Sequence, residues 1–566
     1  MKMVRHISRA DQALADAVGV PPEVLASGAF DGAGTFDKDF ALWTPPLSSP
    51  DSEILPVKDT LDARARDMLR NDGYLQAGAQ LHKDGIVGAQ YRFNSKPNLE
   101  ALGMAEDEEW AREFAQELES KFSLWAESHD CWVDMSRTMT LTEMVRLAVG
   151  VFAATGEALF VSEWDTKTSG RPYKTAFQAI DTDRLRTPSD MIVDESRVRG
   201  GIKFNRAGAP VGYYILDQHP GDAGRFFSLR DPTRYRYVPA RLRNGRPRVI
   251  HVIDRNRPAQ ARAVSSLVAG LREMKLLKTF RDTVLRNAVV NASFAATIES
   301  DLPPEVALAQ VGAGVDNDPY VSAAVKYLSA VGQYVENAQA IRIDGVKIPH
   351  LFPGSKLRLT PAGKVGGVGQ GFEESLIRYL AATLHVSYEE LSRDFRNTNM
   401  SSARAAAMQT GRFMRARKRF VADRVANVIL RNWFEEAANL PPSKGGLETL
   451  RYSRAPNIYR GMNMDAYTAG IWLGAGAEAV DELRGTQAAV LRIKTGLSTH
   501  ERELSNMGME WQSVFRQRAR EKEMMEELGI GMAEDNSVNA ASGSPRQMKD
   551  ADGGLKTPKE VKEVTE

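Results

Sequence analysis

The stretch "SYEELSRDFRNTNMSSARAAAMQTGRF", residues 387–413, decides how this chain is interpreted, because it places a polar interruption between two helical patterns. Apolar side chains recur at steps of four before the interruption and at steps of eight, four and three after it, which is typical of α-helices. They are Phe372, Leu376, Leu380 and Leu384 before the interruption, and Phe413, Val421, Val425 and Val428 after it. We therefore expect a polar loop over residues 386–402, held at each end by a helix.

Upstream of this loop, the sequence predicts a second long helix and an insertion. Residues 261–288 repeat apolar side chains at helical spacing without an internal proline, which gives a helix of about 40 Å. The segment up to Leu359 mixes a helix around 303–339 with strands in "AIRIDGVKI" and "KLRL". The glycine-rich "GGVGQG", residues 366–371, is predicted to be a flexible hinge.

The N-terminal half predicts a mixture of helices and strands. Residues 1–58 are rich in Ala, then in Gly, Pro, Ser and Asp, and we expect a flexible arm. Helical patterns follow over 61–81 and 106–128, separated by a predicted strand in "IVGAQYRF". Short β-rich runs between 157 and 253 are best explained by one irregular sheet domain, so the fold class is α+β.

The C-terminal part is predicted to be helical and then disordered. A helix over 402–438 begins the segment, and Ser498 with Glu501 forms a possible capping box in the helical region 471–528. Residues 529–566 contain too few large apolar side chains to offset the entropy of ordering, so a disordered tail is expected.

Composition excludes several classes of protein. The 566 residues include 74 Lys and Arg against 73 Asp and Glu, so no overall field attracts nucleic acid or an acidic membrane. The single cysteine, Cys131, excludes a disulfide framework and a cysteine-rich zinc site, which fits a reducing compartment such as cytoplasm. No apolar run reaches 18 residues, so we expect neither a membrane span nor a standard secretion signal.

A search for catalytic chemistry finds no candidate. The sequence contains no phosphate-binding Gly-x-x-x-x-Gly-Lys-Ser/Thr motif, no His-Glu-x-x-His and no Gly-x-Ser-x-Gly. The eight histidines are scattered singly rather than at metal-ligand spacing. We predict no catalytic residues, no metal site and no cofactor.

Two basic clusters remain, at 225–248 and in "RFMRARKRF" at 412–420. In the second, Arg412, Arg415 and Arg419 follow helical steps opposite an apolar stripe. A solvated or inter-subunit face and a phosphate-contacting face both stay open for them. In the first, Arg and Tyr alternate as in a half-buried strand, which is unlike a base-stacking platform.

Several strings, in order, resemble the portal proteins of lambda-type tailed phages. They are "RNDGYLQAGAQLHKDGIVG", "AATIES", "GVKIPHLFPG", "FEESLIRYLAATLHVSYEELSRD", "SSARAAAMQTGRFMRARKRFVA" and "KTGLSTHERELSNMG", and they extend from about residue 60 to 520. The resemblance implies a subunit of a ring, usually of twelve copies, at one capsid vertex. It implies no enzymatic activity.

The resemblance also implies a division of the chain. The implied regions are an arm (1–58), a sheet-rich wing (59–258), a first stem helix (259–290), an α/β clip (291–366), a second stem helix (367–385), a tunnel loop (386–402), a wing helix and return (403–470), a helical crown (471–528) and the tail (529–566). The tunnel loop would face double-stranded DNA without reading bases, through Arg393, Arg396, Asn397, Asn399 and Ser401. Relatives often carry Asn-Tyr-Ser-Ser where this chain has Asn399-Met400-Ser401-Ser402.

The implied partners follow from the same resemblance. Ile348, Leu351 and Phe352 in the clip would dock the terminase large subunit and later a head–tail completion protein. Major capsid and scaffold proteins would surround the ring, which would assemble in the host cytoplasm and remain in the virion. The leading alternative is a structural head–tail adaptor or capsid component without a translocation role. The pair of long helices that brackets residues 291–366 distinguishes a portal protein from such an adaptor. A maturation protease is more distant, because no nucleophile with a base is found.

Overall fold

The computed structural model describes residues 16–17, 19, 43, 45–188, 197–222, 234–293, 341–343, 346–348, 365–396, 398–451, 455–476 and 482–529. Within these ranges the chain forms two compact units. The first contains residues up to Ile86 and from Leu124 to Ser453, and the second combines Val87–Ser123 with the chain from Arg454 onward. The structure therefore groups residues 87–123, predicted as part of the wing, with the C-terminal segment.

Between residues 157 and 253 the described part of the first unit contains two antiparallel sheets where the sequence predicts one. The three-stranded sheet has the order β3-β2-β8, and the four-stranded sheet has the order β4-β5-β6-β7. The strands are β2 (Glu157–Trp164), β3 (Thr175–Ile180), β4 (Val198–Arg199), β5 (Ile202–Phe204), β6 (Pro210–Leu216), β7 (Tyr235–Pro239) and β8 (Val249–Ile253). One apolar core joins both sheets, with Leu159 and Val161 of β2 clustered with Ile202 of β5 and Ile215 of β6.

Four helices in the described part of the first unit precede these sheets in the chain. They are α3 (Pro50–Ile54), α4 (Lys58–Asn71), α5 (Gly73–Ile86) and α8 (Leu141–Thr155), and α8 packs against β2. Asp72 separates α4 from α5, because its carboxylate accepts hydrogen bonds from the backbone N–H groups of Tyr74 and Leu75. Helix α8 begins with a capping box between Thr140 and Glu143.

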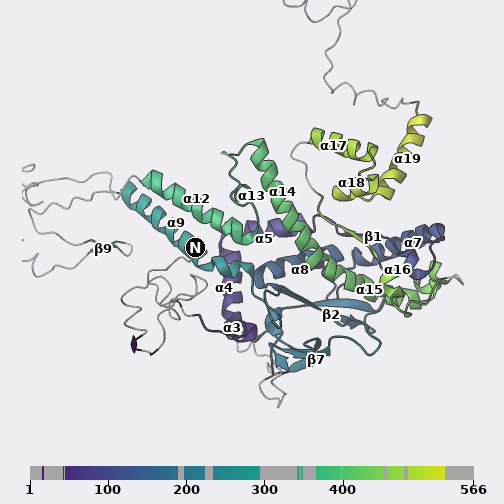
Figure 1. Ribbon diagram of the computed structural model, residues 1–566, viewed down its shortest axis with the longest axis horizontal. Coiled ribbons are helices and arrows are strands. Elements are labelled where there is room, and N and C mark those ends of the chain that lie inside the picture. The colour runs from purple at the N-terminus through teal and green to yellow at the C-terminus, as the bar shows by residue number, and fades with distance from the viewer. Residues whose placement is uncertain are drawn as a thin grey trace, which may run out of the picture. The chain divides into compact units, whose positions relative to one another are not determined.

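Two long helices, α9 (Leu271–Ser293) and α12 (Val365–Leu384), lie side by side (Figure 1). An ion pair of 2.8 Å joins Arg281 to Glu373, and the rings of Phe280 and Phe372 lie 5.2 Å apart. Helix α9 begins later than the predicted start at 259, after the 3₁₀ turn Ser266–Gly270. The glycine-rich segment 366–371 is part of α12, so the predicted hinge is wrong.

The chain that follows α12 is more helical than predicted. A short helix, α13 (Tyr388–Ser392), occupies part of the expected loop, and α14 (Met400–Arg417) follows. The π-helical turn Lys418–Ala422 joins α14 to α15 (Asp423–Asn439), which buries Trp433 and Phe434. Between α9 and α12 the structure describes the hairpin β9 (Ile341–Ile343) and β10 (Val346–Ile348). The predicted helix at 303–339 and the strand "KLRL" lie outside the described residues.

The second unit is built on a two-stranded antiparallel sheet of β1 (Arg92–Ser95) and β11 (Gly470–Leu473). The predicted strand in "IVGAQYRF" is wrong at its start, because α5 continues to Ile86. Trp472 stacks on Tyr91 and contacts Phe93. The helices of this unit are α6 (Leu99–Leu102), α7 (Glu108–Ala126, whose last turn enters the first unit), α16 (Asn463–Tyr467), α17 (Glu482–Lys494), α18 (His500–Asn506) and α19 (Trp511–Glu527).

One predicted cap shifts by a residue. Thr499 rather than Ser498 caps α18, by accepting a hydrogen bond from the backbone N–H of Arg502. The other member of the predicted box, Glu501, forms an ion pair of 2.6 Å with Lys96. In the part of the chain that the structure describes, no helix combines the length and apolar character that crossing a bilayer requires.

Candidate functional site: the loop between α13 and α14

The candidate site is the loop Arg393–Asn399, and both of its ends are fixed. Helix α13 begins with a capping box in which Ser387 and Glu390 exchange hydrogen bonds. Leu391 is buried beside Gly78 of α5, where a Cβ would lie 2.6 Å from the Leu384 side chain. The hydroxyl of Thr410 on α14 donates to Glu390 at 2.7 Å. The loop is therefore shorter than the predicted span 386–402, because helical caps take up both sides.

Inside the loop, Asp394 and Arg396 form a tight ion pair. The guanidinium donates from Nε at 2.9 Å and from Nη2 at 2.6 Å, and the backbone N–H of Arg396 adds a third hydrogen bond at 3.1 Å. The side-chain hydrogen bond from Arg396 lowers the pKa of Asp394 to about 2. Both groups are solvent-accessible, so the pair fixes the shape of the loop and neutralises part of its charge.

Two further residues set the backbone at the ends of the loop. Arg393 ends α13 in the left-handed conformation, with φ of 58°, and its N–H donates to Glu389 at 2.9 Å. The side-chain carbonyl of Asn399 accepts the N–H of Ser402 at 2.8 Å and thereby caps α14. Asn399 therefore acts first as a helix cap.

The structure leaves most of the predicted loop residues accessible. Arg393, Arg396, Asn399 and Ser401 are exposed, whereas Asn397 lies outside the described residues. Two apolar side chains that the sequence analysis did not select also face solvent: Phe395 is 55% exposed and Met400 is 62% exposed. Each is a single apolar residue in a polar stretch, directly after a charged or capping residue. Hydrophobic periodicity in the sequence therefore gives no sign that they are exposed at this site.

A compact cluster anchors α14 beneath the loop. Arg417 forms an ion pair of 2.7 Å with Asp254, and its guanidinium lies over the Phe413 ring. Phe413 also stacks on His385, which follows α12 with φ of 57°. Burial lowers the pKa of His82, whose Nε2 bonds the Leu384 carbonyl at 2.7 Å. The end of α12 and the inner face of α14 are thus held together by neutral imidazoles and one arginine.

A buried ionic cluster connects the start of α9 to the sheets. Glu157 of β2 accepts hydrogen bonds from Arg262 and forms an ion pair of 3.0 Å with Lys58. The Nε2 atom of His251 lies 3.3 Å from the same carboxylate. Burial alone would raise the pKa of Glu157, but Arg262 and Lys58 hold it well below its usual range. Burial raises the pKa of the neighbouring Asp62 to about 6. This cluster ties together α4, β2, β8 and the segment that leads into α9.

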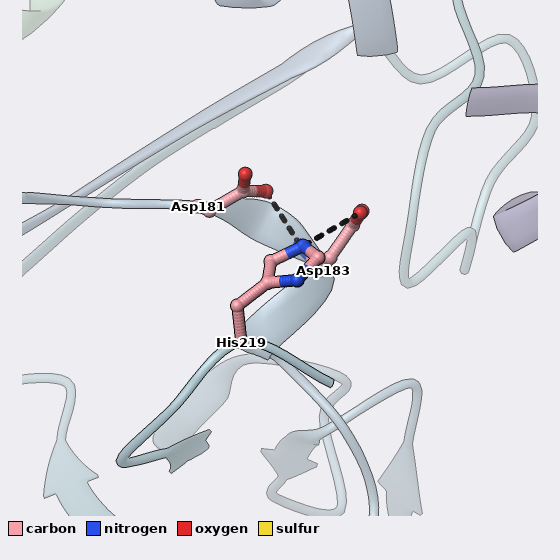
Figure 2. Close-up of side chains that lie close together, drawn as sticks. All are labelled: Asp181, Asp183 and His219. Atoms are coloured by element: carbon pink, nitrogen blue, oxygen red, sulfur yellow. Dashed lines mark hydrogen bonds and ion pairs between the residues drawn. The ribbon is translucent and has the colours of Figure 1, made fainter. Parts of the chain in front are cut away.

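One grouping among the described residues has the composition of a metal site. It consists of Asp181, Asp183 and His219 (Figure 2), with the His219 Nε2 3.3 Å from an Asp183 oxygen. Arg66 already contacts both carboxylates, at 3.1 Å to an oxygen of each. A guanidinium in that position supplies the positive charge that a cation would bring, so we assign the grouping to an ion-pair network.

Of the three predicted docking residues in the insertion, the structure describes one. Ile348 lies in β10, where it pairs with Ile341 of β9. Leu351 and Phe352 lie outside the described residues. Their role as a docking surface therefore stays a prediction.

Comparison with known proteins identifies relatives that match most of the chain. The family described as "Phage portal protein, lambda family" matches residues 36–418. The portal protein of Escherichia phage N15 is 34% identical over 510 residues, covering 89% of this chain and 91% of that protein. Portal protein B of Escherichia phage lambda is 34% identical over 511 residues, with the same coverage of 89% and 91%.

More distant similarities follow. The probable portal protein of Halomonas phage phiHAP-1 is 22% identical over 501 residues, covering 86% of this chain and 85% of that protein. Among solved structures, a chain from the neck of an empty GTA particle computed with C6 symmetry gives a TM-score of 0.36 at 12% identity, covering 79% of this chain and 93% of that one. Because the family match spans more than half of the sequence and two relatives share 34% identity over 89% of it, the chain belongs to the lambda family of phage portal proteins.

Proposed function

We propose that this portal protein assembles as a ring, of twelve subunits, at one capsid vertex, where DNA passes through the central channel during packaging and ejection. The observation that carries this proposal is the family match, which includes the capped loop Arg393–Asn399 and both long helices. The family match disfavours an adaptor or capsid component without a translocation role. The ring would be assembled in the host cytoplasm and kept in the virion.

The division of labour along the chain belongs to the same proposal. Helices α9 and α12 would form the stem, the segment between them the clip, the sheets the wing and α17–α19 the crown. The tunnel loop would line the passage with Arg393, Arg396, Asn397, Asn399 and Ser401 without reading bases. The neutralising pair of Asp394 with Arg396 supports this role, because a sliding duplex requires weak, exchangeable contacts.

The partners of this ring are proposed by chemistry and by position. Apolar residues of the clip, including Ile348, Leu351 and Phe352, would dock the terminase large subunit and then a head–tail completion protein. Major capsid and scaffold proteins would contact the outside of the ring. We propose no enzymatic activity for the chain itself, since the sequence contains no nucleotide cradle, and DNA movement would be driven by the docked motor.

Electron microscopy of the purified full-length protein tests the proposal. We expect negatively stained particles with a central hole and a rotational symmetry that classification resolves. Co-purification with the terminase large subunit separates a portal from an adaptor, because an adaptor without a translocation role has no reason to bind the packaging motor. Monomers at micromolar concentration, or rings that never retain terminase, would contradict the proposed function.

A further inference from the structure

The sequence around α14 lacks acidic residues over an unusual length. Between Asp394 and Asp423 the chain contains no Asp or Glu, although acids and bases are almost equal in number overall. The same stretch contains seven basic residues: Arg396, Arg404, Arg412, Arg415, Arg417, Lys418 and Arg419. Such segregation of charge is not required for a solvated helix, for which Glu–Lys pairs would be stabilising.

The structure separates these seven residues into two groups. Three of them have acidic partners: Arg396 pairs with Asp394, Arg417 with Asp254 and Lys418 with Asp423. The other four are all exposed, and no ion pair joins them to an acid within the described part of the chain. They are Arg404, Arg412, Arg415 and Arg419.

These four arginines share one face of the helix. At 100° per residue, Arg404, Arg412 and Arg415 fall within about 80° of one another, and Arg419 continues the line into the π-helical turn. The opposite face carries Phe413 and the buried Met414, which pack toward the interior. We call the outer row, Arg404, Arg412, Arg415 and Arg419, the arginine ridge.

We propose that the arginine ridge binds the phosphate backbone of double-stranded DNA, an inference that rests on the proposed function. The ridge is about 22 Å long at 1.5 Å per residue. The same length of duplex carries about a dozen phosphates, at one charge per 1.7 Å. The ridge therefore supplies the attractive contacts, whereas Arg396 in the loop is already neutralised by Asp394.

The composition of the ridge favours DNA over a second copy of this chain. Protein interfaces have apolar or aromatic residues at their centre, and interfaces with DNA are polar and strongly positive. Met408 is the one large apolar side chain among the described residues of this row. The row contains no aromatic anchor of the kind found at the centre of protein interfaces.

The binding that follows is non-specific and compatible with sliding. Each exposed guanidinium contributes little by itself, and its contact with a phosphate is screened by salt. A helix also holds the four groups at fixed spacing, so a phosphate that leaves one arginine approaches the next. The expected behaviour is retention of the duplex without a preferred register.

The test measures how DNA affinity depends on salt, with assembled rings of the full chain and a fluorescent 60-base-pair duplex. The variant replaces Arg404, Arg412, Arg415 and Arg419 by Gln, which preserves helix propensity. We expect the slope of log affinity against log salt to become shallower by about 0.9 per lost phosphate contact, which is about 3.6 for each subunit whose ridge contacts the duplex. Two half variants, one with Arg404→Gln and Arg412→Gln and one with the other pair, should each account for about half of the change.

A matched control removes the same charge elsewhere. Arg516, Arg518, Arg520 and Lys522 are exposed on α19, and their replacement by Gln should leave the slope unchanged. An equal loss in both variants would overturn the ridge assignment in favour of an effect of net charge.

The remaining outcomes are also decisive. Assembled ridge variants with an unchanged slope would overturn the assignment and leave the proposed function standing. Half variants that fold but form no rings would show that the ridge contacts a second copy, and would also overturn it. A wild-type chain that forms no rings would refute the proposed function itself.

Discussion

Glu157 is fully buried at the start of β2, where Lys58 and Arg262 share its carboxylate. Replacing Glu157 by Gln leaves two buried cations without their counter-charge, and breaking such a cluster costs about 3–5 kcal/mol. We expect hydrogen exchange of the β2 and β8 amides in Glu157→Gln to accelerate accordingly. The measurement is exchange followed by mass spectrometry at neutral pH.

Glu163, at the other end of β2, provides the control for that experiment. Its carboxylate pairs with Arg236 at 2.7 Å and Arg248 at 3.3 Å, but the three side chains are partly exposed. Ion pairs of this kind contribute about 1 kcal/mol or less. Equal exchange rates in Glu157→Gln and Glu163→Gln would contradict the assignment of Glu157 as the centre of the cluster.

Glu119 of α7 makes the second unit sensitive to pH. Burial raises the pKa of Glu119 from 4.5 to about 7, although its carboxylate accepts the N–H of Ser95. The folded state therefore favours the neutral carboxyl of Glu119. Its contribution to the stability of the second unit is fully present below pH 4.5 and is lost as the pH rises through about 7. Glu119→Gln should therefore be more stable than wild type at pH 8, by about 2 kcal/mol after allowance for partial exposure, and nearly equal at pH 4.5.

Thermal unfolding at the two pH values checks this expectation. Glu113→Gln, on an exposed position of the same helix, removes one carboxylate without removing a buried one. A stability difference for Glu119→Gln that is the same at pH 4.5 and pH 8 would rule out titration of Glu119 as its cause.

Single residues of the site were predictable where their partners are close in sequence. Asp394 and Arg396 are two residues apart, so opposite charges this close in the sequence already allow the ion pair that the structure shows. The cluster around Glu157 was not predictable, because Lys58 and Arg262 are each about a hundred residues from it. Periodicity reports which face is buried, but it does not report which charges meet there.

At the scale of the element, Asn399 and its cap decide where α14 begins. Asn399→Ala removes the acceptor for the Ser402 N–H and should cost about 1 kcal/mol of local stability. Asn399→Asp keeps an acceptor at the cap and should preserve the helix. Hydrogen exchange of the amides at 401–404 distinguishes the two variants. Equal protection in Asn399→Ala and wild type would show that the cap is dispensable.

The loop itself yields a prediction about DNA. Replacing Arg393 and Arg396 by Ala should leave rings assembled but change how much DNA is packaged or retained, with an effect that shrinks at high salt. Asp394→Asn releases Arg396 from its pair and should act in the opposite direction, with tighter retention at low salt. The measurement is the length of DNA protected in filled heads across a salt series.

The alternative for these arginines is a structural role. Arg396 fixes the loop through Asp394, and Arg393 ends α13, so the double variant could collapse the loop instead. Failure of ring assembly would favour that structural role. Assembled rings with unchanged packaging and retention at every salt concentration would contradict the tunnel-loop proposal.

Elements with a strong period were predicted well, and their ends were not. The helices around 106–128, 367–385 and 402–438 correspond to α7, α12 and the α14–α15 pair. The start of β1 was misplaced because "IVGAQYRF" has alternating apolar residues, although its first residue completes α5. Tertiary packing decided that boundary, since Ile86 is buried at the end of the helix.

At the scale of the whole molecule, the fold class and the family were predictable from the order of the segments. The division into units was not, because residues 87–123 pair with the C-terminal segment through β1 and β11, a contact between strands far apart in sequence. Strand pairs of this kind leave no local trace in the sequence. The aromatic residues Tyr91 and Trp472 gave no indication of their partner for the same reason.

The clip carries the last prediction. The string "GVKIPHLFPG" places Leu351 and Phe352 between two prolines that follow β10 in the sequence. Apolar side chains in such a turn are better explained by contacts with a neighbouring subunit or a docked partner than by a local core. Replacing both by Ser should weaken terminase docking or ring closure at least tenfold, while the folding of the subunit stays intact.

Docking is measured as the affinity of assembled rings for the terminase large subunit, and folding by circular dichroism of the same sample. Leu497 and Leu528 are 74% and 67% exposed in the second unit, so their replacement by Ser removes two exposed apolar side chains that are not part of the clip segment. That control should bind terminase as wild type does, because we attribute weakened docking to the clip residues and not to a general loss of apolar surface. A clip variant that closes rings, binds terminase and packages DNA normally would refute the docking assignment, because no other role proposed for Leu351 and Phe352 requires their apolar side chains.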